Sequence, residues 1–375
     1  IVLAAAAGCG VPPVGEYPWS AETVQARMDV LGVPAVSVAV IDGLEIAWAG
    51  AYGVLETPDG PPADPDTLFQ TASVGKSAAA MSVLTQVGLG AFDLDQDVTT
   101  YLRTWTLPQG AQSSTNPVTL RRLLSHTAGT TETGLAGYPR GAPLPTLDQT
   151  LAGQPPANSP PVRVEVPPGT GYRYSNLGYQ VAQKVLEDTT GVPFADLVTD
   201  TVFNPIGMTS SRYAPLPSEA QSRAASGHRA DGSVVPGQWR EYPEHAAAGY
   251  WTTPTDLARF GIDLMESWRD GSGAVLSQEL AREMLTPVDA IDPDAASTQP
   301  PPPRVTYALG LGIGDDGGDR LHAIHTGGNT YAQIGFQSKI VLYPERGQGM
   351  VVLTNSDTGD ALIDELVASV SRELG

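Results

Sequence analysis

Cysteine and lysine are scarce in this chain of 375 residues. The single cysteine, Cys9, excludes a disulfide within the chain. Of the 21 lysines and arginines, only three are lysines, at positions 76, 184 and 339. Each lysine is therefore a stronger candidate for a specific function than a lysine in a chain with many.

Positive charge is scarce as a whole. Asp and Glu number 41, and the formal net charge is −20 at pH 7. Nucleic acids and anionic lipids are themselves negatively charged, so the chain repels them and we expect neither as a partner. The acidic residues are spread along the chain without forming a tail, which indicates a solvated surface.

Long apolar runs are missing downstream of the first residues, so no later membrane-spanning helix is expected. The first nine residues, IVLAAAAGC, are apolar and end in small residues, as the end of a signal sequence does. We expect residues 1–19 to be a signal-peptide remnant and linker, and the protein to be exported to the periplasm or the medium. Cys9 is a candidate lipid-anchor site, with ordinary signal cleavage as the equal alternative.

Strand patterns lie near both ends of the chain. Residues 35–54 contain two β-branched and aromatic runs joined at Asp42-Gly43, which predicts a hairpin, and residues 338–355 repeat the form. Helical spacing of apolar residues flanks these hairpins at about 20–31 and 360–374. The patterns predict an α+β fold, with an antiparallel sheet built from both termini and flanked by the terminal helices.

The middle of the chain is mostly helix and loop. Helical patterns fall at about 73–90, 118–125, 177–189 and 254–267, the last behind a capping box that begins at Thr253. We expect an α/β lobe at about 20–72 and 240–375 and a helical lobe at about 73–239, within one domain over 20–375. Two proline-rich stretches, 137–170 and 293–303, predict long loops without packed elements.

The segment QTASVGKS, residues 70–77, has two possible functional interpretations. A phosphate-binding loop requires G-x-x-x-x-G-K-[ST], but its first glycine is replaced by Gln70 and no acidic magnesium ligand follows a suitable strand. The other reading is a nucleophilic serine three residues before a lysine, Ser73 and Lys76. On a helix these two lie on one face, about one turn apart.

The helix that follows Ser73 is apolar nearly all round, so we expect Lys76 to be buried. Burial disfavours the charged ammonium and lowers the pKa of the amine. A neutral lysine can then accept the proton of a serine that is otherwise a poor nucleophile. This chemistry favours the serine reading, although the spacing alone is a weak signal.

Two further segments bear on the choice. Tyr174-Ser175-Asn176 directly precedes a helical pattern, so by itself it is read most simply as a helix N-cap. The segment HTGGN, from His325 to Asn329, by itself is read most simply as a glycine turn in a hairpin.

Taken together and in this order, the three segments resemble the motifs of the penicillin-recognising serine hydrolases. The branch most similar contains class C β-lactamases, soluble D-Ala-D-Ala carboxypeptidases and the related family VIII carboxylesterases. Supporting segments match the same branch and include LRRLLSHTAG (120–129), NPIGMTSSRY (204–213), TTPTDLARF (252–260) and LYPERGQGMVVLTNSD (342–357). The resemblance covers about residues 20–370 and implies the β-lactamase/transpeptidase-like fold.

The resemblance also implies roles. Ser73 would attack the carbonyl carbon, Lys76 and Tyr174 would share the base work, and Tyr174 would protonate the leaving group and then activate water. Asn176 would orient Lys76 and the substrate, and the backbone N–H groups of Ser73 and Gly328 would form the oxyanion hole.

His325, Thr326 and Gly327 would complete the substrate-binding strand. No cofactor or metal is implied, since the five histidines have no accompanying cluster of cysteines or carboxylates.

Four positions depart from the family pattern or suggest another interpretation. Most class C β-lactamases carry lysine where this chain has His325, which supplies less positive charge toward a substrate carboxylate. Tyr250 and Trp251 either narrow the acyl pocket or pack at the surface. His126 suggests a Ser–His triad, but its segment is read as a structural turn because no G-x-S-x-G occurs.

The sequence therefore predicts an exported serine acyl hydrolase. Small carboxylic esters and D-alanyl peptides are equally favoured substrates, and β-lactams come behind them. The alternative is a penicillin-binding-type sensor with little turnover, which would have no need to keep Ser73, Lys76 and Tyr174 together.

Overall fold

The computed structural model describes residues 19–213, 215–288, 305–315, 321–328 and 332–373. Its largest sheet has seven strands in the order β2-β1-β11-β10-β9-β8-β7, and every neighbouring pair is antiparallel. The strands are β1 (Ala35–Asp42), β2 (Glu45–Gly53), β7 (Val305–Tyr307), β8 (Gly312–Asp315), β9 (Leu321–Gly328), β10 (Gln337–Tyr343) and β11 (Gln348–Thr354).

The two ends of the chain meet in the middle of this sheet. β1 pairs with β2 on one side and with β11 on the other, so that Val38 lies opposite both Gly50 and Val352. The predicted α+β fold, with a sheet made from both termini, is confirmed.

The turn of the first hairpin lies one residue later than predicted. Asp42 pairs with Glu45, so the two turn residues are Gly43 and Leu44, not Asp42 and Gly43. Both have positive φ, 61° and 64°. This is the type I′ geometry that fits the twist of the flanking strands, and Leu44 adopts it while its N–H donates to the Gly347 carbonyl.

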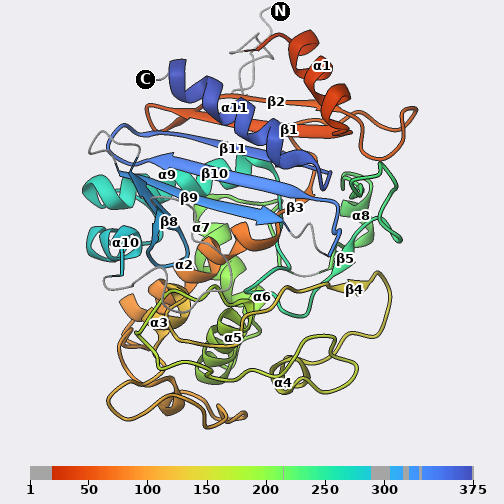
Figure 1. Ribbon diagram of the computed structural model, residues 1–375. Coiled ribbons are helices and arrows are strands. Elements are labelled where there is room, and N and C mark those ends of the chain that lie inside the picture. Colours follow the sequence, from red (N-terminus) through yellow and green to blue (C-terminus); the bar gives the residue numbers. More distant parts are fainter. Residues whose placement is uncertain (1–18, 214, 289–304, 316–320, 329–331, 374–375) are drawn as a thin grey trace, which may run out of the picture.

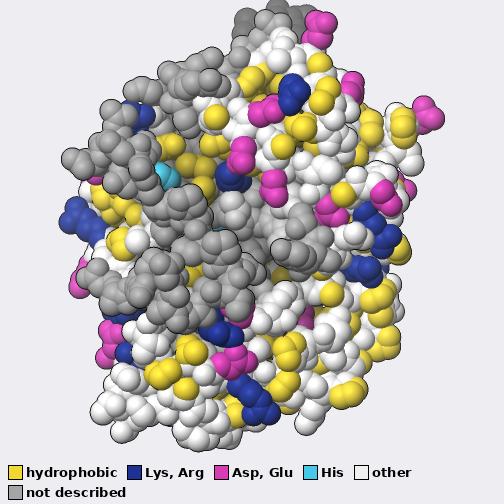
Figure 2. Space-filling view, viewed as in Figure 1, with side chains coloured by type: hydrophobic (Ala, Val, Ile, Leu, Met, Phe, Trp, Pro, Cys, Tyr) yellow, Lys and Arg dark blue, Asp and Glu magenta, His cyan; other side chains and the backbone are white. Residues whose placement is uncertain are grey.

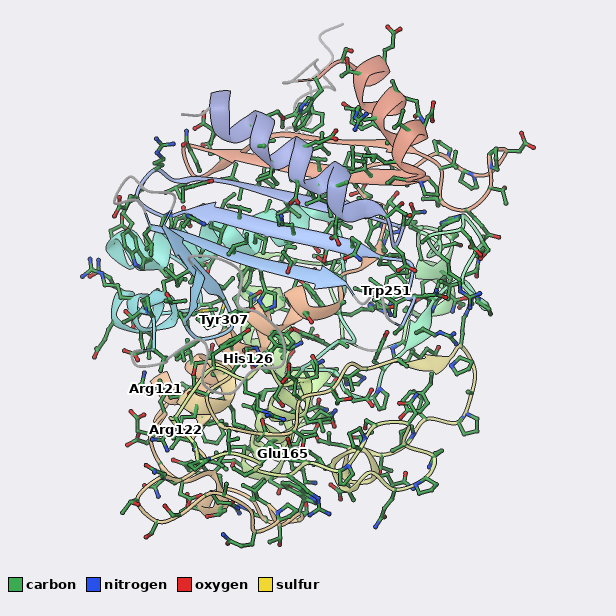
Figure 3. The ribbon with its side chains drawn as sticks, viewed as in Figure 1. Arg121, Arg122, His126, Glu165, Trp251 and Tyr307 are labelled. Atoms are coloured by element: carbon green, nitrogen blue, oxygen red, sulfur yellow. The ribbon has the colours of Figure 1, made fainter. Side chains whose placement is uncertain are left out.

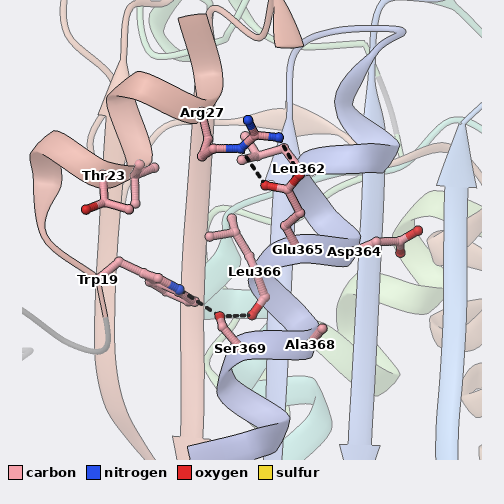
Figure 4. A pocket seen from close by; sticks show the side chains of 10 residues that line it. Trp19, Thr23, Arg27, Leu362, Asp364, Glu365, Leu366, Ala368 and Ser369 are labelled. Carbon is pink, nitrogen blue, oxygen red and sulfur yellow. Dashed lines mark hydrogen bonds and ion pairs between the residues drawn. The ribbon is translucent and has the colours of Figure 1, made fainter. Parts of the chain in front are cut away.

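Helices cover both faces of the sheet. Helices α1 (Ala21–Leu31) and α11 (Gly359–Glu373) lie together on one face, where Val24, Met28 and Leu362 are buried against the strands (Figure 1). The Trp19 indole donates to the Ser369 hydroxyl at 2.7 Å and ties the start of α1 to α11 (Figure 4). Helix α9 (Pro254–Asp270) covers the other face. Its N-cap Thr253 accepts from the Asp256 N–H, which is one half of the predicted capping box, whereas the Asp256 carboxylate accepts from Ser210 and Ser211 instead of the Thr253 backbone.

Helices α2 to α6 lie in the lower half of Figure 1, below the sheet. Helix α2 runs through them with nearly every side chain buried, as the apolar sequence predicts. These helices are α2 (Gly75–Gly88), α3 (Leu120–Leu124), α4 (Leu147–Ala152), α5 (Asn176–Thr190) and α6 (Phe194–Val198). The other helical elements are α7 (Asn204–Ile206), α8 (Ser218–Gln221), α10 (Gln278–Leu285), η1 (Ala72–Val74), η2 (Val98–Thr100) and η3 (Thr199–Phe203).

The proline-rich stretch 137–170 is not wholly loop, as the sequence suggested. It contains α4, which begins with a capping box between Thr146 and Gln149, and the short strand β4 (Tyr138–Pro139), which pairs with β5 (Arg240–Glu241). The second proline cluster and the expected signal remnant lie outside the described residues. The lobe boundaries stay a prediction.

Acidic and basic side chains are interspersed over the face that carries α11 (Figure 2). Within the described part of the chain, no helix is both long and apolar enough to cross a membrane.

Candidate active site

Ser73 lies in η1, the tight turn that connects β3 (Phe69–Gln70) to α2. β3 pairs with β6 (Trp251–Thr252), and the Thr71 N–H donates to the Tyr250 carbonyl, so the turn is fixed on both sides. Ala72 has a φ of 46°, a conformation that costs free energy for a residue with a Cβ. The turn leaves Ser73 partly exposed while its neighbours are buried.

Lys76 is completely buried and reaches Ser73 as the i, i+3 spacing predicts. Its Nζ lies 2.9 Å from Ser73 Oγ, 2.7 Å from Asn176 Oδ1 and 2.6 Å from the carbonyl oxygen of Ala247. Three groups from different parts of the chain therefore position the amine.

The contacts of Lys76 determine which atom holds the proton. The Asn176 amide oxygen and the Ala247 carbonyl are acceptors only, so they take two N–H donors of the amine. Burial lowers the pKa of Lys76 well below its ordinary value of 10.5, which favours the neutral form. A neutral amine has two N–H groups and one lone pair, and the lone pair is left to face Ser73. In its neutral form, Lys76 could therefore accept the serine proton.

Tyr174 lies on the other side of the serine. Its hydroxyl donates to Ser73 Oγ at 2.8 Å, and its ring lies 5.2 Å from Lys76 Nζ. Burial raises the pKa of Tyr174 above its ordinary value of 10, and nearby Tyr307 raises it further, while the hydrogen bond to Ser73 opposes the rise. Tyr174 is therefore a proton donor in the resting site and not a base.

At the start of α5, Ser175 and Asn176 have different roles, which the sequence alone did not distinguish. Ser175 is the N-cap: its hydroxyl accepts from the Gly178 N–H and donates to the Thr131 carbonyl. Asn176 is the first helical residue, and its side chain is free to contact Lys76 and the Thr133 carbonyl. The N-cap reading holds for Ser175 alone.

The segment His325–Gly328 forms the end of β9, so its reading as a hairpin turn is wrong; Asn329 lies outside the described residues. β9 runs beside η1. A Cβ added at Gly327 would lie 2.0 Å from the Thr71 carbonyl oxygen, so glycine is required for this approach. Ser338 on β10 fixes the approach, since its hydroxyl lies 2.9 Å from that same carbonyl.

His325 is buried, whereas Thr326 is exposed. The Nδ1 of His325 lies 2.7 Å from the Gly310 carbonyl, an acceptor, so Nδ1 carries the proton. Burial lowers the pKa of His325 to about 3, although the hydrogen bond to Gly310 opposes the shift. This imidazole is neutral at physiological pH and supplies no fixed positive charge to the site.

His126 is not part of a Ser–His triad. Its Nδ1 accepts from the Ser175 N–H at 3.1 Å, and its ring packs on Tyr174 with 4.1 Å between ring centroids. Tyr307 packs against the same imidazole, and Figure 3 shows the two side chains side by side between the sheet and the helices. Burial is the main reason why the pKa of His126 lies well below 6.5, so the ring is neutral.

The structure corrects the two readings of Tyr250 and Trp251. Both side chains are buried in the core, so they neither pack at the surface nor line an open pocket. Tyr250 stacks on Tyr213, and Trp251 packs edge-on against Trp239. In Figure 3, Trp251 lies well away from the His126 and Tyr307 side chains.

Sequence reasoning missed several groups that shape the site. The Ala247 carbonyl and the Thr71 carbonyl are backbone atoms, which no residue pattern reveals. Ser338 and Tyr307 are side chains in strands whose distance from Ser73 depends on the fold. Among the described residues, no group of three or more His, Cys, Asp or Glu side chains could hold a metal ion.

The seven-stranded antiparallel sheet, with its helices on both faces, is the fold of the penicillin-binding proteins and β-lactamases. The octameric penicillin-binding protein homologue from Pyrococcus abyssi aligns with a TM-score of 0.70 at 22% identity, over 90% of this chain and 73% of that chain. The chain belongs to the Beta-lactamase family, whose model matches residues 21–370. The resemblance seen in the sequence is confirmed.

Of two similar proteins, one is named as an esterase and the other as a penicillin-binding protein. Esterase EstB of Burkholderia gladioli is 33% identical over 218 residues, which are 56% of this chain and 53% of the esterase. Penicillin-binding protein 4 of Amycolatopsis lactamdurans is 31% identical over 247 residues, 63% of this chain and 61% of that protein. The chain thus spans a little over half the length of these relatives.

Proposed function

We propose that this protein is a serine hydrolase that cleaves carboxylic esters through an acyl-enzyme. One observation carries the proposal: the Ser73 hydroxyl contacts both a buried amine, Lys76, and a buried phenol, Tyr174. The two partners are protonated differently, one ready to accept a proton and the other ready to donate one. Transfer of an acyl group from an ester to a serine requires both a proton acceptor for the serine and a proton donor for the leaving alkoxide.

In the acylation step, Ser73 Oγ attacks the ester carbonyl and its proton passes to Lys76 Nζ. The N–H groups of Ser73 and Gly328 would hold the resulting oxyanion, and one such donor is worth about 3 kcal/mol of barrier. When the tetrahedral intermediate collapses, the leaving alkoxide takes the proton of Tyr174. The site then contains an acyl-serine, an ammonium and a phenolate.

In the deacylation step, the Tyr174 phenolate takes a proton from water, and the hydroxide attacks the acyl carbonyl. Ser73 leaves and recovers its proton from Lys76, which restores the resting site. The phenolate exists only while Lys76 is charged, and the short separation between ammonium and ring stabilises it. This sequence explains how a tyrosine with a raised pKa can serve as a base.

The neutral His325 favours esters over substrates that carry a carboxylate next to the scissile bond. A β-lactam and a D-alanyl-D-alanine peptide both present such a carboxylate, and a fixed cation would bind it best. Similarity to Esterase EstB supports the ester. Similarity to penicillin-binding protein 4 supports D-alanyl peptide hydrolysis as the second candidate, with β-lactams third.

The test is hydrolysis of p-nitrophenyl butyrate, a D-Ala-D-Ala peptide and a penicillin by the wild type and by Ser73→Ala. We expect the ester to be turned over fastest, and Ser73→Ala to fall to the uncatalysed rate because the nucleophile is gone. Intact mass spectrometry of the wild type should show a butyryl group on Ser73.

Ser82→Ala is the matched control, because Ser82 lies on the same helix and contacts Thr201 instead of the site. It should keep wild-type turnover. Ester hydrolysis that survives in Ser73→Ala would refute the proposal, and penicillin labelling without turnover of any substrate would favour the sensor.

A further inference from the structure

Tyr307 is the last residue of β7, and its ring lies among the aromatic side chains of the candidate active site (Figure 3). Its ring centroid is 5.2 Å from that of His126, 5.0 Å from that of Tyr172 and 6.5 Å from that of Tyr174. On the sheet side, the His325 ring lies edge-on to it at 6.3 Å. Aromatic rings at such separations attract one another, so Tyr307 connects the segment before α5 with β9.

The backbone beside Tyr307 is fixed by contacts that do not involve Tyr174. In the turn that leads into β8, the Gly310 N–H donates to the Leu124 carbonyl at 3.2 Å, and the Gly310 carbonyl lies 2.7 Å from His325 Nδ1. A Cβ added at Gly310 would lie 2.9 Å from the Lys76 carbonyl oxygen, so the turn packs directly on α2. The Tyr307 ring is therefore attached to a turn that three other elements hold in place.

The phenol of Tyr174 changes its hydrogen bonding during the proposed reaction. In the resting site its hydroxyl donates to Ser73 Oγ at 2.8 Å, which by itself places the phenol. In the acyl-enzyme, Tyr174 is a phenolate and Ser73 Oγ is an ester oxygen. Both are acceptors without a proton, so this hydrogen bond cannot form.

During deacylation, packing must therefore keep the phenolate where it can take a proton from water. The His126 ring packs on Tyr174 at 4.1 Å, and Tyr307 packs on both of these rings. Burial raises the pKa of Tyr307 to about 12, so its own phenol is neutral and does not compete as a base at neutral pH.

We propose that Tyr307 is a positioning residue that holds Tyr174 in place for deacylation, when the hydrogen bond to Ser73 is absent. This inference rests on the proposed function, of which it specifies one step. The chemistry of that step is unchanged: the Tyr174 phenolate takes a proton from water, and the hydroxide attacks the acyl carbonyl. Tyr307 acts through its ring, on Tyr174 directly and through His126.

The test is Tyr307→Leu, which removes the ring, with p-nitrophenyl butyrate as substrate. Release of nitrophenolate reports acylation, for which the hydrogen bond between Tyr174 and Ser73 is still present, so kcat/KM should stay within about twofold of the wild type. Deacylation should slow, so kcat should fall about tenfold or more and KM should fall with it. A burst of nitrophenolate should appear, and intact mass spectrometry during turnover should show a larger fraction of butyryl-enzyme than in the wild type.

Two further variants separate the ring from general packing. Tyr307→Phe keeps the ring, so its kcat should stay within about twofold of the wild type. Tyr101→Leu is the matched control, because the Tyr101 ring packs on Phe92 at 5.1 Å and its hydroxyl accepts from the Asp93 N–H at 2.9 Å, away from the site. It loses comparable contacts and should keep wild-type kcat. Thermal unfolding checks that each variant folds, and Tyr307→Met replaces Tyr307→Leu if the latter does not.

The outcomes distinguish this inference from the proposed function. No turnover of any ester by the wild type would refute the proposed function. With an active wild type, an unchanged kcat in Tyr307→Leu would refute only the positioning role. Equal losses in kcat and kcat/KM without a burst would also overturn it, because they indicate a general structural defect. A loss in Tyr307→Phe as large as that in Tyr307→Leu would show that the ring is not the group that matters.

Discussion

The three lysines of the chain have different environments. Lys184 and Lys339 each form an ion pair with an aspartate, Asp148 and Asp364. Lys76 is buried without a carboxylate partner and contacts only neutral acceptors and Ser73. In the proposed mechanism the neutral form of this lysine takes the serine proton, and the free-energy cost of burying the amine lowers the stability of the fold.

Replacing Lys76 by Met should therefore change how stability depends on pH. The pKa of Lys76 is lowered in the folded state, so between that pKa and 10.5 the unfolded chain binds one more proton than the folded chain. The free energy of unfolding of the wild type then rises with pH through this window. We expect Lys76→Met to gain most over the wild type near pH 6 and to lose this advantage toward pH 10.

Thermal unfolding at several pH values measures this difference. The hydrogen bonds to Asn176 and Ala247 are lost in the variant at every pH, so they shift the difference by a constant. A difference in Tm that does not vary with pH would show that Lys76 stays charged in the folded protein.

His126 positions Tyr174 without touching the serine. Its ring packs on the phenol, and its Nδ1 holds the Ser175 N–H at the start of α5. We expect His126→Ala to lower kcat for methyl butyrate about 10- to 100-fold, because a misplaced Tyr174 protonates the alkoxide poorly. p-Nitrophenyl butyrate should lose less, since nitrophenolate leaves without a proton.

His126→Asn separates the two contacts of this residue. Asparagine tolerates the φ of 61° at this position and can accept from Ser175, but it lacks the ring. It should recover stability while keeping the dependence on the leaving group. Equal losses for the two esters in His126→Ala would mean that the residue has a structural role only.

At the scale of single residues, chemistry made part of the site predictable. Ser73, Lys76 and Tyr174 were identified from motifs, and the structure brings all three within hydrogen-bond reach. The sequence predicted that His325 supplies less positive charge than a lysine, but not that its imidazole is neutral. Its burial and its contact with the Gly310 carbonyl depend on the fold. The roles of these residues in turnover stay predictions until the variants are measured.

At the scale of elements, the close approach of β9 to η1 sets the geometry of the candidate oxyanion hole. Gly327→Ala would place a methyl group 2.0 Å from the Thr71 carbonyl, so strand and turn must separate. We expect ester turnover to fall by about 100-fold or more, because the oxyanion donors would be displaced. Steady-state kinetics with p-nitrophenyl butyrate measures the effect.

Gly88→Ala is the control for this substitution. At Gly88, near the end of α2, the new methyl group would meet only the end of the Leu280 side chain, at 3.0 Å. Its turnover should stay close to that of the wild type. Wild-type turnover in Gly327→Ala would contradict the requirement for close approach.

For some elements, local sequence patterns were sufficient to predict the structure. The Thr253–Asp256 cap predicted α9 because side chain and backbone meet within four residues. The equivalent box of Thr146 and Gln149 was overlooked because prolines surround it, and α4 was missed. The shift of the first hairpin turn to Gly43-Leu44 arises from a long-range contact with Gly347, which no local pattern contains.

At the scale of the whole molecule, the sequence predicted the four strands of the two hairpins, but not the other three strands of the sheet or the strand order. Two hairpins near opposite ends required some pairing, and the apolar faces of the terminal helices indicated a shared layer. The β9-β8-β7 edge was not predicted, because β7 has only three residues and two of the four residues of β8 are glycines, which are depleted in strands. The arrangement of the helices likewise depends on contacts between distant segments.

The pairing of β1 with β11 affects when the sheet can form during synthesis. The ribosome completes β1 and β2 early and makes β11 close to the end of the chain. Throughout that interval one side of the apolar strand β1 lacks its neighbour, and such an open edge invites pairing with other chains. This part of the sheet can close only after β11 has been made, so the open side of β1 persists while all the segments between the two strands are synthesised.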